Sequence, residues 1–218
     1  MYKILKITKK LNGNFNLYIK DYKDEKLEVH LETLYSYGLL SKKEMDEKEF
    51  EDMLVENEKK LAKQKALKTL SMANKTKKEL ILKLKQSKFS TEAIDYAMTF
   101  VDRYDFIDEE NIAKTFVEGK YSKKRYSKRA MMSKLRQKGI SSDVIGDSVK
   151  DIGDDEEFEN AMYFAQKKLR TIRDDDKYKV RNKLMSALSY RGFSYDIIKR
   201  VSEHILKDFG QEDEYYDV

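Results

Sequence analysis

A short phrase that occurs three times constrains the fold of this 218-residue sequence more than any other feature. Each copy begins with Leu, places an apolar residue five positions later and follows it directly with Ser. The copies occupy residues 84–90, 135–141 and 188–194, so successive leucines are 51 residues (84 to 135) and 53 residues (135 to 188) apart. Repetition at such a period predicts tandem copies of one supersecondary unit.

The chemistry of the phrase predicts a helix that stops and a second helix that starts at once. Gly139 and Gly192 each follow a basic residue, and Gly adopts the left-handed conformation of a helix stop without steric cost. The first copy carries Lys88 at this position, where a residue with a side chain is strained. The Ser that closes each copy can accept a backbone N–H as an N-cap. These residues are Ser90, Ser141 and Ser194.

Helical periodicity on both sides of the phrase completes the repeat. After the third Ser, apolar residues return three, four, seven and eleven positions on, which is the spacing of one helix face. Two further helical stretches precede each copy and are joined by loops of variable length. We therefore predict a mainly α protein with three tandem three-helix repeats in an elongated array. The repeats cover residues 61–105, 108–153 and 156–209, and an acidic tail covers residues 210–218.

The first 60 residues predict a different kind of structure. Apolar residues alternate with polar ones on both sides of Asn12-Gly13, a dipeptide typical of a tight β-hairpin turn. A third alternating run at Leu27, Val29 and Leu31 follows a polar turn. We predict a small antiparallel β meander and, from residue 31 to residue 58, an acidic and mostly helical segment. Because two or three strands are not stable alone, the meander should pack on the first helices.

Composition narrows the class of protein. With 40% hydrophobic and 39% charged residues, the chain can bury a core that is divided among several small units. The sequence has no Cys to form disulfides or to bind thiophilic metals. It has no apolar run of membrane-spanning length, and lysines interrupt the N-terminus where a secretory signal would be apolar. We therefore expect a cytoplasmic location.

Basic residues gather in two places, although the net charge is only +5. The first cluster lies within residues 119–140, contains no acidic residue and is interleaved with two tyrosines. On a helix, Arg125, Arg129 and Arg136 project from one face. The basic residues of this cluster are Lys120, Lys123, Lys124, Arg125, Lys128, Arg129, Lys134, Arg136 and Lys138.

The second basic cluster comprises Lys167, Lys168, Arg170 and Arg173. Either cluster could clamp a polyanion or an acidic partner. The alternative interpretation is that both are solvated faces of a Lys-rich helical protein. Two acidic stretches, at residues 151–159 and 212–217, would repel nucleic acid and could equally meet a basic protein partner.

The sequence contains no catalytic signal. His30 and His204 stand alone, and no metal-binding, nucleophile-elbow or phosphate-loop motif surrounds a candidate base or nucleophile. The carboxylates of residues 174–176 lack the spacing of a defined cation-binding loop. We therefore predict no catalytic residue, no cofactor site and no metal site, and we expect a protein that is not an enzyme.

Three segments together carry a resemblance to a known family. Residues 107–113 read Ile-Asp-Glu-Glu-Asn-Ile-Ala, residues 138–140 read Lys-Gly-Ile, and residues 191–194 read Arg-Gly-Phe-Ser. In their order, spacing and threefold repetition they resemble the bacterial RecX regulatory proteins, in the longer form with an N-terminal β extension. The resemblance covers essentially the whole chain. It departs from the family at Ile112, where Phe is common, and at Lys88, which replaces the first Gly.

The resemblance implies a protein of tandem three-helix repeats that modulates the recombinase RecA, usually by inhibition. Such a protein lies along the groove of the RecA filament on single-stranded DNA and contacts adjacent protomers. It thereby hinders ATP hydrolysis, strand exchange or filament growth, which affects recombination, DNA repair and the SOS response. We expect it to act as a monomer and without a cofactor.

We predict that basic residues of both clusters contact the RecA filament or the single-stranded DNA within it. The apolar residues between helix stop and N-cap, Phe89, Ile140 and Phe193, are expected in the core instead. The predicted contact residues are Lys120, Lys123, Lys124, Arg125, Lys128, Arg129, Arg136, Lys167, Lys168, Arg170, Arg173 and Arg191.

Two alternative functions remain open from the sequence. The helix junction also resembles a helix-turn-helix turn, which would suit a helical nucleic-acid-binding protein that acts without a recombinase. The helix after the turn is a poor reader of DNA, since it carries Asp143, Asp147 and Asp151 in the second repeat, and an ordinary αα corner explains the same turn. The second alternative is a scaffold or adaptor with no role on nucleic acid.

Overall fold

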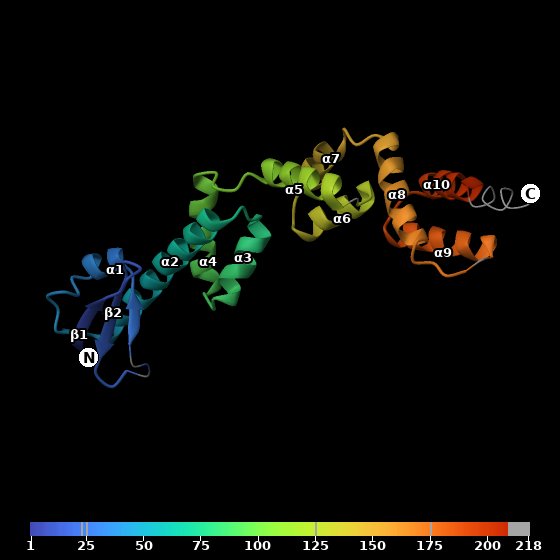
Figure 1. The fold of residues 1–218 in the computed structure, drawn as a ribbon. Helices are drawn as coiled ribbons and strands as arrows, with labels where there is room; N and C mark the ends of the chain where they lie inside the picture. The colour runs from blue at the N-terminus through green and yellow to red at the C-terminus, as the bar shows by residue number, and fades with distance from the viewer. Residues whose placement is uncertain (23, 25, 125, 175, 209–218) are drawn as a thin grey trace, which may run out of the picture. The chain divides into compact units, whose positions relative to one another are not determined.

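The computed structural model describes residues 1–22, 24, 26–124, 126–174 and 176–208, and for residues 120–124 and 208 it describes the backbone alone. The described residues are mostly helical and begin with an antiparallel sheet (Figure 1). The chain divides into two compact units, Met1–Ile107 and Asp108–Val218. The first unit contains the sheet and the first repeat, and the second unit contains the other two repeats.

The sheet has the strand order β3-β2-β1-β4, with every neighbouring pair antiparallel. The β1–β2 hairpin turns at Asn12-Gly13, and Gly13 has a φ of +88°, so the predicted meander is confirmed. The fourth strand was not predicted, because two residues are too few to make an alternating pattern. The strands are β1 (Tyr2–Lys9), β2 (Phe15–Ile19), β3 (Leu27–Val29) and β4 (Glu44–Met45).

The prediction that Leu31 continues the third strand is wrong. Strand β3 ends at Val29, and His30 is the N-cap of helix α1 (Leu31–Ser36). The imidazole Nδ1 of His30 accepts a hydrogen bond from the backbone N–H of Glu32 at 3.1 Å. Leu31 is therefore the first helical residue, and its side chain is 42% exposed. The helix cap overrides the alternating pattern at this position.

Helix α2 (Glu47–Met72) joins the sheet to the first repeat and runs through residue 60, the expected end of the N-terminal segment. Its first half buries Phe50 and Met53 against the sheet. Its second half buries Ala62 and Ala66 against the other helices of the repeat. One continuous helix thus contributes to two neighbouring cores, which explains why the sheet and the first repeat form one compact unit.

The helices of the three repeats follow the predicted order. Each repeat buries its own apolar core among the described residues, and the phrase leucines Leu84, Leu135 and Leu188 are all inaccessible to solvent. The first repeat adds α3 (Lys77–Gln86) and α4 (Thr91–Arg103) to α2. The second consists of α5 (Glu109–Lys124), α6 (Lys128–Gln137) and α7 (Ser142–Val149). The third consists of α8 (Asp154–Leu169), α9 (Lys177–Tyr190) and α10 (Tyr195–Asp208).

The repeated phrase forms a Schellman motif at the end of α3, α6 and α9. In α9, the N–H of Phe193 donates to the carbonyl of Leu188 at 3.3 Å, and the N–H of Gly192 donates to the carbonyl of Ser189 at 2.8 Å. The first bond recurs from Phe89 to Leu84 and from Ile140 to Leu135. The second recurs from Lys88 to the carbonyl of Lys85 and from Gly139 to that of Arg136. These bonds satisfy the last carbonyls of the helix and bring the two apolar residues of the phrase together.

The left-handed residue is retained in all three motifs. Gly139 and Gly192 have φ values of +86° and +83°, and Lys88 has a φ of +64° despite its side chain. The Ser that follows caps the next helix. Ser90 accepts from the N–H of Ala93 at 3.3 Å, and the other two serines make the equivalent bond. The expectation that Ile140 and Phe193 are core residues is confirmed by their burial, whereas Phe89 is half-buried and packs against the edge of the first core.

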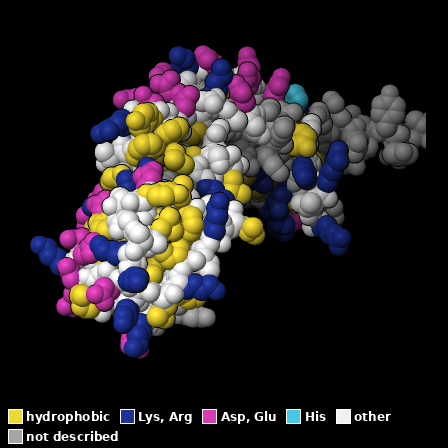
Figure 2. All heavy atoms as spheres, turned by 90° about the vertical axis from the view of Figure 1, so that its left-hand side faces the viewer, with side chains coloured by type: hydrophobic (Ala, Val, Ile, Leu, Met, Phe, Trp, Pro, Cys, Tyr) yellow, Lys and Arg dark blue, Asp and Glu magenta, His cyan; other side chains and the backbone are white. Residues whose placement is uncertain are grey.

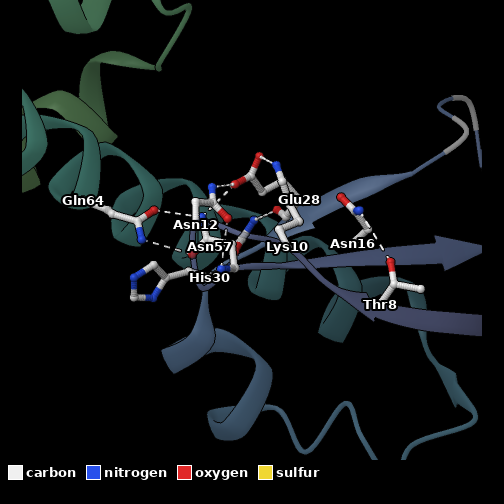
Figure 3. A network of polar contacts seen from close by, with 9 residues as sticks. Thr8, Lys10, Asn12, Asn16, Glu28, His30, Asn57 and Gln64 are labelled. Carbon is white, nitrogen blue, oxygen red and sulfur yellow. Dashed lines mark hydrogen bonds and ion pairs between the residues drawn. The ribbon is translucent and has the colours of Figure 1, made fainter.

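A polar network fastens the hairpin and β3 to α2 (Figure 3). Buried Asn14 exchanges side-chain hydrogen bonds with Gln64 of α2, at 2.8 and 3.1 Å. Buried Asn57, also from α2, accepts from the N–H of His30 and donates to the carbonyl of Glu28, both at 2.8 Å. The bonds of Asn57 satisfy two backbone groups at the end of β3, and those of Asn14 join the hairpin to α2, so the network fixes the sheet on the helix.

Glu28 is the charged centre of this network. Its carboxylate accepts from Asn12 and Asn14 at 2.9 and 2.7 Å and pairs with Lys10. Burial alone would raise the pKa of Glu28, but the hydrogen bonds from Asn14, Lys10 and Asn12 together hold it below its usual value. The carboxylate therefore stays ionised and keeps all three donors.

The surface of the N-terminal unit is not uniformly charged. Figure 2, which views the molecule from the side where the sheet lies in Figure 1, shows hydrophobic side chains among those of Lys and Arg. Leu5, Tyr35 and Leu40 of this unit are largely exposed. Scattered apolar side chains of this kind are common on protein surfaces and need no partner.

Replacing Lys88 with Gly should stabilise the N-terminal unit by about 1 kcal/mol, because Gly adopts a positive φ without a clash of its Cβ. Leu82→Gly is the matched control, since exposed Leu82 lies inside α3 and outside the helix stop, where Gly costs about 1 kcal/mol. Thermal unfolding should place the first variant above the wild type and the second below it. A Lys88→Gly variant no more stable than the wild type would contradict this account of the helix stop.

Candidate functional site

A groove between α8 and α9 gathers basic residues from the third repeat. It has a volume of 950 Å³ and brings together Lys168, Arg173 and Arg191, all predicted contact residues. A fourth cation, Lys183, pairs with Asp174 at 2.7 Å. None of the described residues that line the groove is acidic. Its remaining lining residues are Phe164, Thr171, Ile172, Asn182, Ser186, Ala187 and Tyr190.

The side chain of Arg191 is held in place by aromatic rings. Its guanidinium carbon lies 4.4 Å from the ring centroid of Phe164 and 5.9 Å from that of Tyr126. Its backbone N–H donates to the carbonyl of Ala187 at 3.2 Å, so the residue also caps α9. Because stacking fixes the guanidinium plane, this cation loses little conformational freedom when it binds an anion.

A second groove lies on the other face of α9 and has a volume of 740 Å³. Its basic residue is Arg129, which lies on α6 of the second repeat and belongs to the first basic cluster. The groove is therefore lined by residues of both the second and the third repeat. Ser186 and Tyr190 line this groove as well as the first one. The C-terminal half of α9 therefore forms a ridge between two grooves, each with cationic residues.

Sequence reasoning missed two tyrosines of the second groove, Tyr190 at the end of α9 and Tyr195 at the start of α10. Tyr190 is 94% exposed and Tyr195 is 69% exposed, and both line the second groove. Exposed aromatic rings next to cations are the usual platform on which the bases of single-stranded nucleic acids stack. The available signal in the sequence was that Tyr190 lies within the third phrase and Tyr195 directly follows it.

The second and third repeats are joined by hydrogen bonds between helix ends. Ser127 is fully buried and caps α6, accepting from the N–H of Ala130 at 3.1 Å. Its hydroxyl donates to the carbonyl of Arg191 at 2.7 Å. The carboxylate of Glu157, in α8, accepts from the N–H of Lys128 at 3.1 Å. Burial raises the pKa of Glu157, although its bond with Lys128 acts in the opposite direction.

The other predicted contact residues lie in several places. Arg136, Lys167 and Arg170 are exposed, on α6 and at the end of α8. Lys128 is half-buried, and its ammonium donates to the carbonyl of Ile152 at 3.2 Å. Arg125 and the side chains of Lys120, Lys123 and Lys124 lie outside the described residues. Of the predicted set, the structure therefore brings Lys168, Arg173 and Arg191 into one groove and Arg129 into its neighbour.

The acidic and histidine residues considered in the sequence have local partners. Asp176 caps α9 by accepting from the N–H groups of Tyr178 and Lys179, and His204 contacts the edge of Phe158, with a centroid distance of 6.3 Å. Within the described part of the chain, no group of three or more His, Asp or Glu side chains is placed to hold a metal ion. No described helix combines the length and apolar character needed to cross a membrane.

The fold and these grooves define the class of protein as a tandem three-helix repeat protein with a basic, aromatic-lined surface. Family models for the first, second and third three-helix domains of RecX match residues 62–100, 108–148 and 154–201. The regulatory protein RecX of Clostridioides difficile (strain 630) is 32% identical over 200 residues, which cover 91% of this chain and 92% of that protein. The chain belongs to the RecX family.

Other relatives agree with this assignment. The regulatory protein RecX of Finegoldia magna is 36% identical over 139 residues, covering 63% of this chain and 68% of that protein. A crystal structure of a regulatory protein RecX matches with a TM-score of 0.68 at 22% identity, covering 93% of this chain and all of that one. RecX from Lactobacillus salivarius matches with a TM-score of 0.58 at 24% identity, covering 67% and 96%. The resemblance identified from the sequence is confirmed.

Ser127→Ala tests the joint between the second and third repeats. This variant should lose about 2 kcal/mol of stability, about half from the lost N-cap and half from the Arg191 carbonyl left without its donor. Ser141→Ala is the matched control, because exposed Ser141 caps α7 in the same unit and should cost about 1 kcal/mol. Chemical denaturation measures both values. Equal losses for the two variants would show that the Ser127–Arg191 bond contributes nothing.

Proposed function

We propose that this protein regulates the RecA recombinase by binding its filament on single-stranded DNA. Binding inhibits ATP hydrolysis, strand exchange and filament growth, and so limits recombination, DNA repair and the SOS response. Membership of the RecX family supports the regulatory role. The observation that carries the proposal is the groove between α8 and α9, where Lys168, Arg173 and Arg191 converge and no described lining residue is acidic.

The two grooves on either side of α9 match the chemistry of a nucleoprotein filament. Cations in a groove attract phosphate oxygens or acidic protein side chains, and their contribution falls as salt increases. The exposed rings of Tyr190 and Tyr195 add a surface on which unpaired bases stack. Arg191 is already stacked on Phe164, so it offers a guanidinium in a fixed orientation, which suits planar, bidentate contacts.

Inhibition in this proposal follows from binding alone. A ligand that binds one state of a filament shifts the population toward that state by its differential affinity. A protein with two compact units can contact more than one protomer and so oppose the changes that accompany ATP hydrolysis and subunit addition. The protein acts as a cytoplasmic monomer, without a cofactor and without a catalytic step of its own.

A variant with neutralised groove cations tests the proposal. Arg129→Gln, Lys168→Gln and Arg173→Gln are combined in one protein, because these side chains line the grooves. The matched control combines Lys177→Gln, Lys199→Gln and Lys207→Gln, three exposed lysines of the third repeat that line neither groove. Recombinase ATPase on single-stranded DNA is measured against increasing amounts of each protein.

The wild type and the control should inhibit at the same concentration, and the groove variant should need at least about tenfold more, since three charge-assisted contacts are lost. Equal inhibition by both variants would remove these grooves from the filament contact. A wild type that leaves the ATPase unchanged, yet binds bare single strands or duplex tightly, would instead favour a nucleic-acid-binding protein that acts without a recombinase.

A further inference from the structure

A third groove lies in the second repeat and has the opposite charge. It is formed by α5, α7 and the start of α8, and its volume is 560 Å³. Among the described lining residues, carboxylates outnumber ammonium groups by five to two. The acidic lining residues are Glu110, Glu118, Asp147, Asp151 and Glu156, and the basic ones are Lys114 and Lys150. This groove therefore attracts cations and repels nucleic acid.

The floor of the acidic groove is apolar. Val117, Val144 and Ile152 line it and belong to the edge of the second core. Val117 is buried, whereas Val144 and Ile152 are half-buried and keep apolar surface within reach of a ligand. Concave sites that combine an apolar floor with a few charged groups at the rim are typical binding sites for side chains of a partner.

The two described cations of the groove are too few to neutralise its five described carboxylates. Lys150 pairs with Asp147 at 3.7 Å, but both side chains are exposed, so the pair is weak and water screens it. Helix α7 ends at Val149, beside the groove, and the C-terminal end of a helix adds partial negative charge. The segment after α7 already receives one ammonium, from Lys128 to the carbonyl of Ile152 at 3.2 Å.

We propose that this groove docks a short cationic, amphipathic segment of a partner protein. Lys or Arg side chains of the segment pair with the rim carboxylates of Asp147, Asp151 and Glu156, and its aliphatic side chains cover the floor at Val144 and Ile152. A nucleic acid cannot replace such a segment, because its phosphates would face these carboxylates. The assignment goes beyond the regulation of RecA, since it depends only on the chemistry of this groove.

The test uses the full chain and a fluorescein-labelled synthetic peptide of Lys and Leu in helical amphipathic order. Fluorescence anisotropy at about 0.1 M salt measures binding, where the Debye length is about 10 Å. The groove variant combines Asp147→Asn, Asp151→Asn and Glu156→Gln. The control variant removes the same charge at exposed acids outside the groove, through Asp143→Asn, Glu159→Gln and Glu203→Gln.

The groove variant should bind the peptide about tenfold more weakly than the wild type, and the control variant should stay within about twofold of it. Equal weakening of both variants would mean that overall charge, rather than the groove, attracts the peptide, and would overturn the proposal. The replaced side chains are exposed, so both variants should unfold at similar temperatures to the wild type.

A second comparison needs no variant of the protein. A peptide with Ser in place of every Leu keeps the charge and loses the apolar face, so the wild type should bind it at least about tenfold more weakly. Equal affinity for the two peptides would also overturn the proposal. Neither peptide measurement contains recombinase or DNA, so a negative result in it does not affect the proposed regulation of RecA. A negative result in the recombinase ATPase measurement likewise does not affect the proposed docking of a cationic segment.

Discussion

Each repeat of this protein depends on one hydrogen bond that closes over a left-handed residue. The bond runs from the N–H of an apolar residue back to the carbonyl of a Leu five positions earlier, at 3.5 Å in the first repeat, 3.2 Å in the second and 3.3 Å in the third. It ends one helix, and the Ser that follows starts the next. Because the Leu and the apolar residue are both drawn into the core, local backbone geometry and burial favour the same structure.

Because backbone geometry and burial favour the same structure, the three-helix repeats can be predicted from the sequence. All the groups of the helix stop lie within seven residues, so the three repeats can be identified from the phrase alone. Lys88 takes a φ of +64° at the position where the other copies have Gly. The stabilisation by the closing hydrogen bond and the buried apolar residues is therefore larger than the steric cost of a side chain in this conformation. The strand β4 and the extent of α2 could not be predicted in the same way, because tertiary pairing of Glu44–Met45 with β1 and shared cores define them.

The candidate site is less predictable than the fold. Runs of Lys and Arg indicated where cations lie along the chain, but a charge run does not specify which residues share a groove. Arg191 joins Lys168 and Arg173 only because α9 packs against α8, and Arg129 reaches α9 only through the joint between Ser127 and Arg191. The described grooves therefore differ in charge, with an acidic groove in the second repeat and a basic groove in the third.

The most direct test of this account is hydrogen–deuterium exchange of the full chain, free and bound to a RecA filament on single-stranded DNA. The account predicts slower exchange in the bound state at residues 164–173 and 182–191, which line the basic grooves, with a much smaller effect when bare single strands replace the filament. Protection confined to other helices, with these two segments unchanged, would contradict the central claim that the filament binds beside α9.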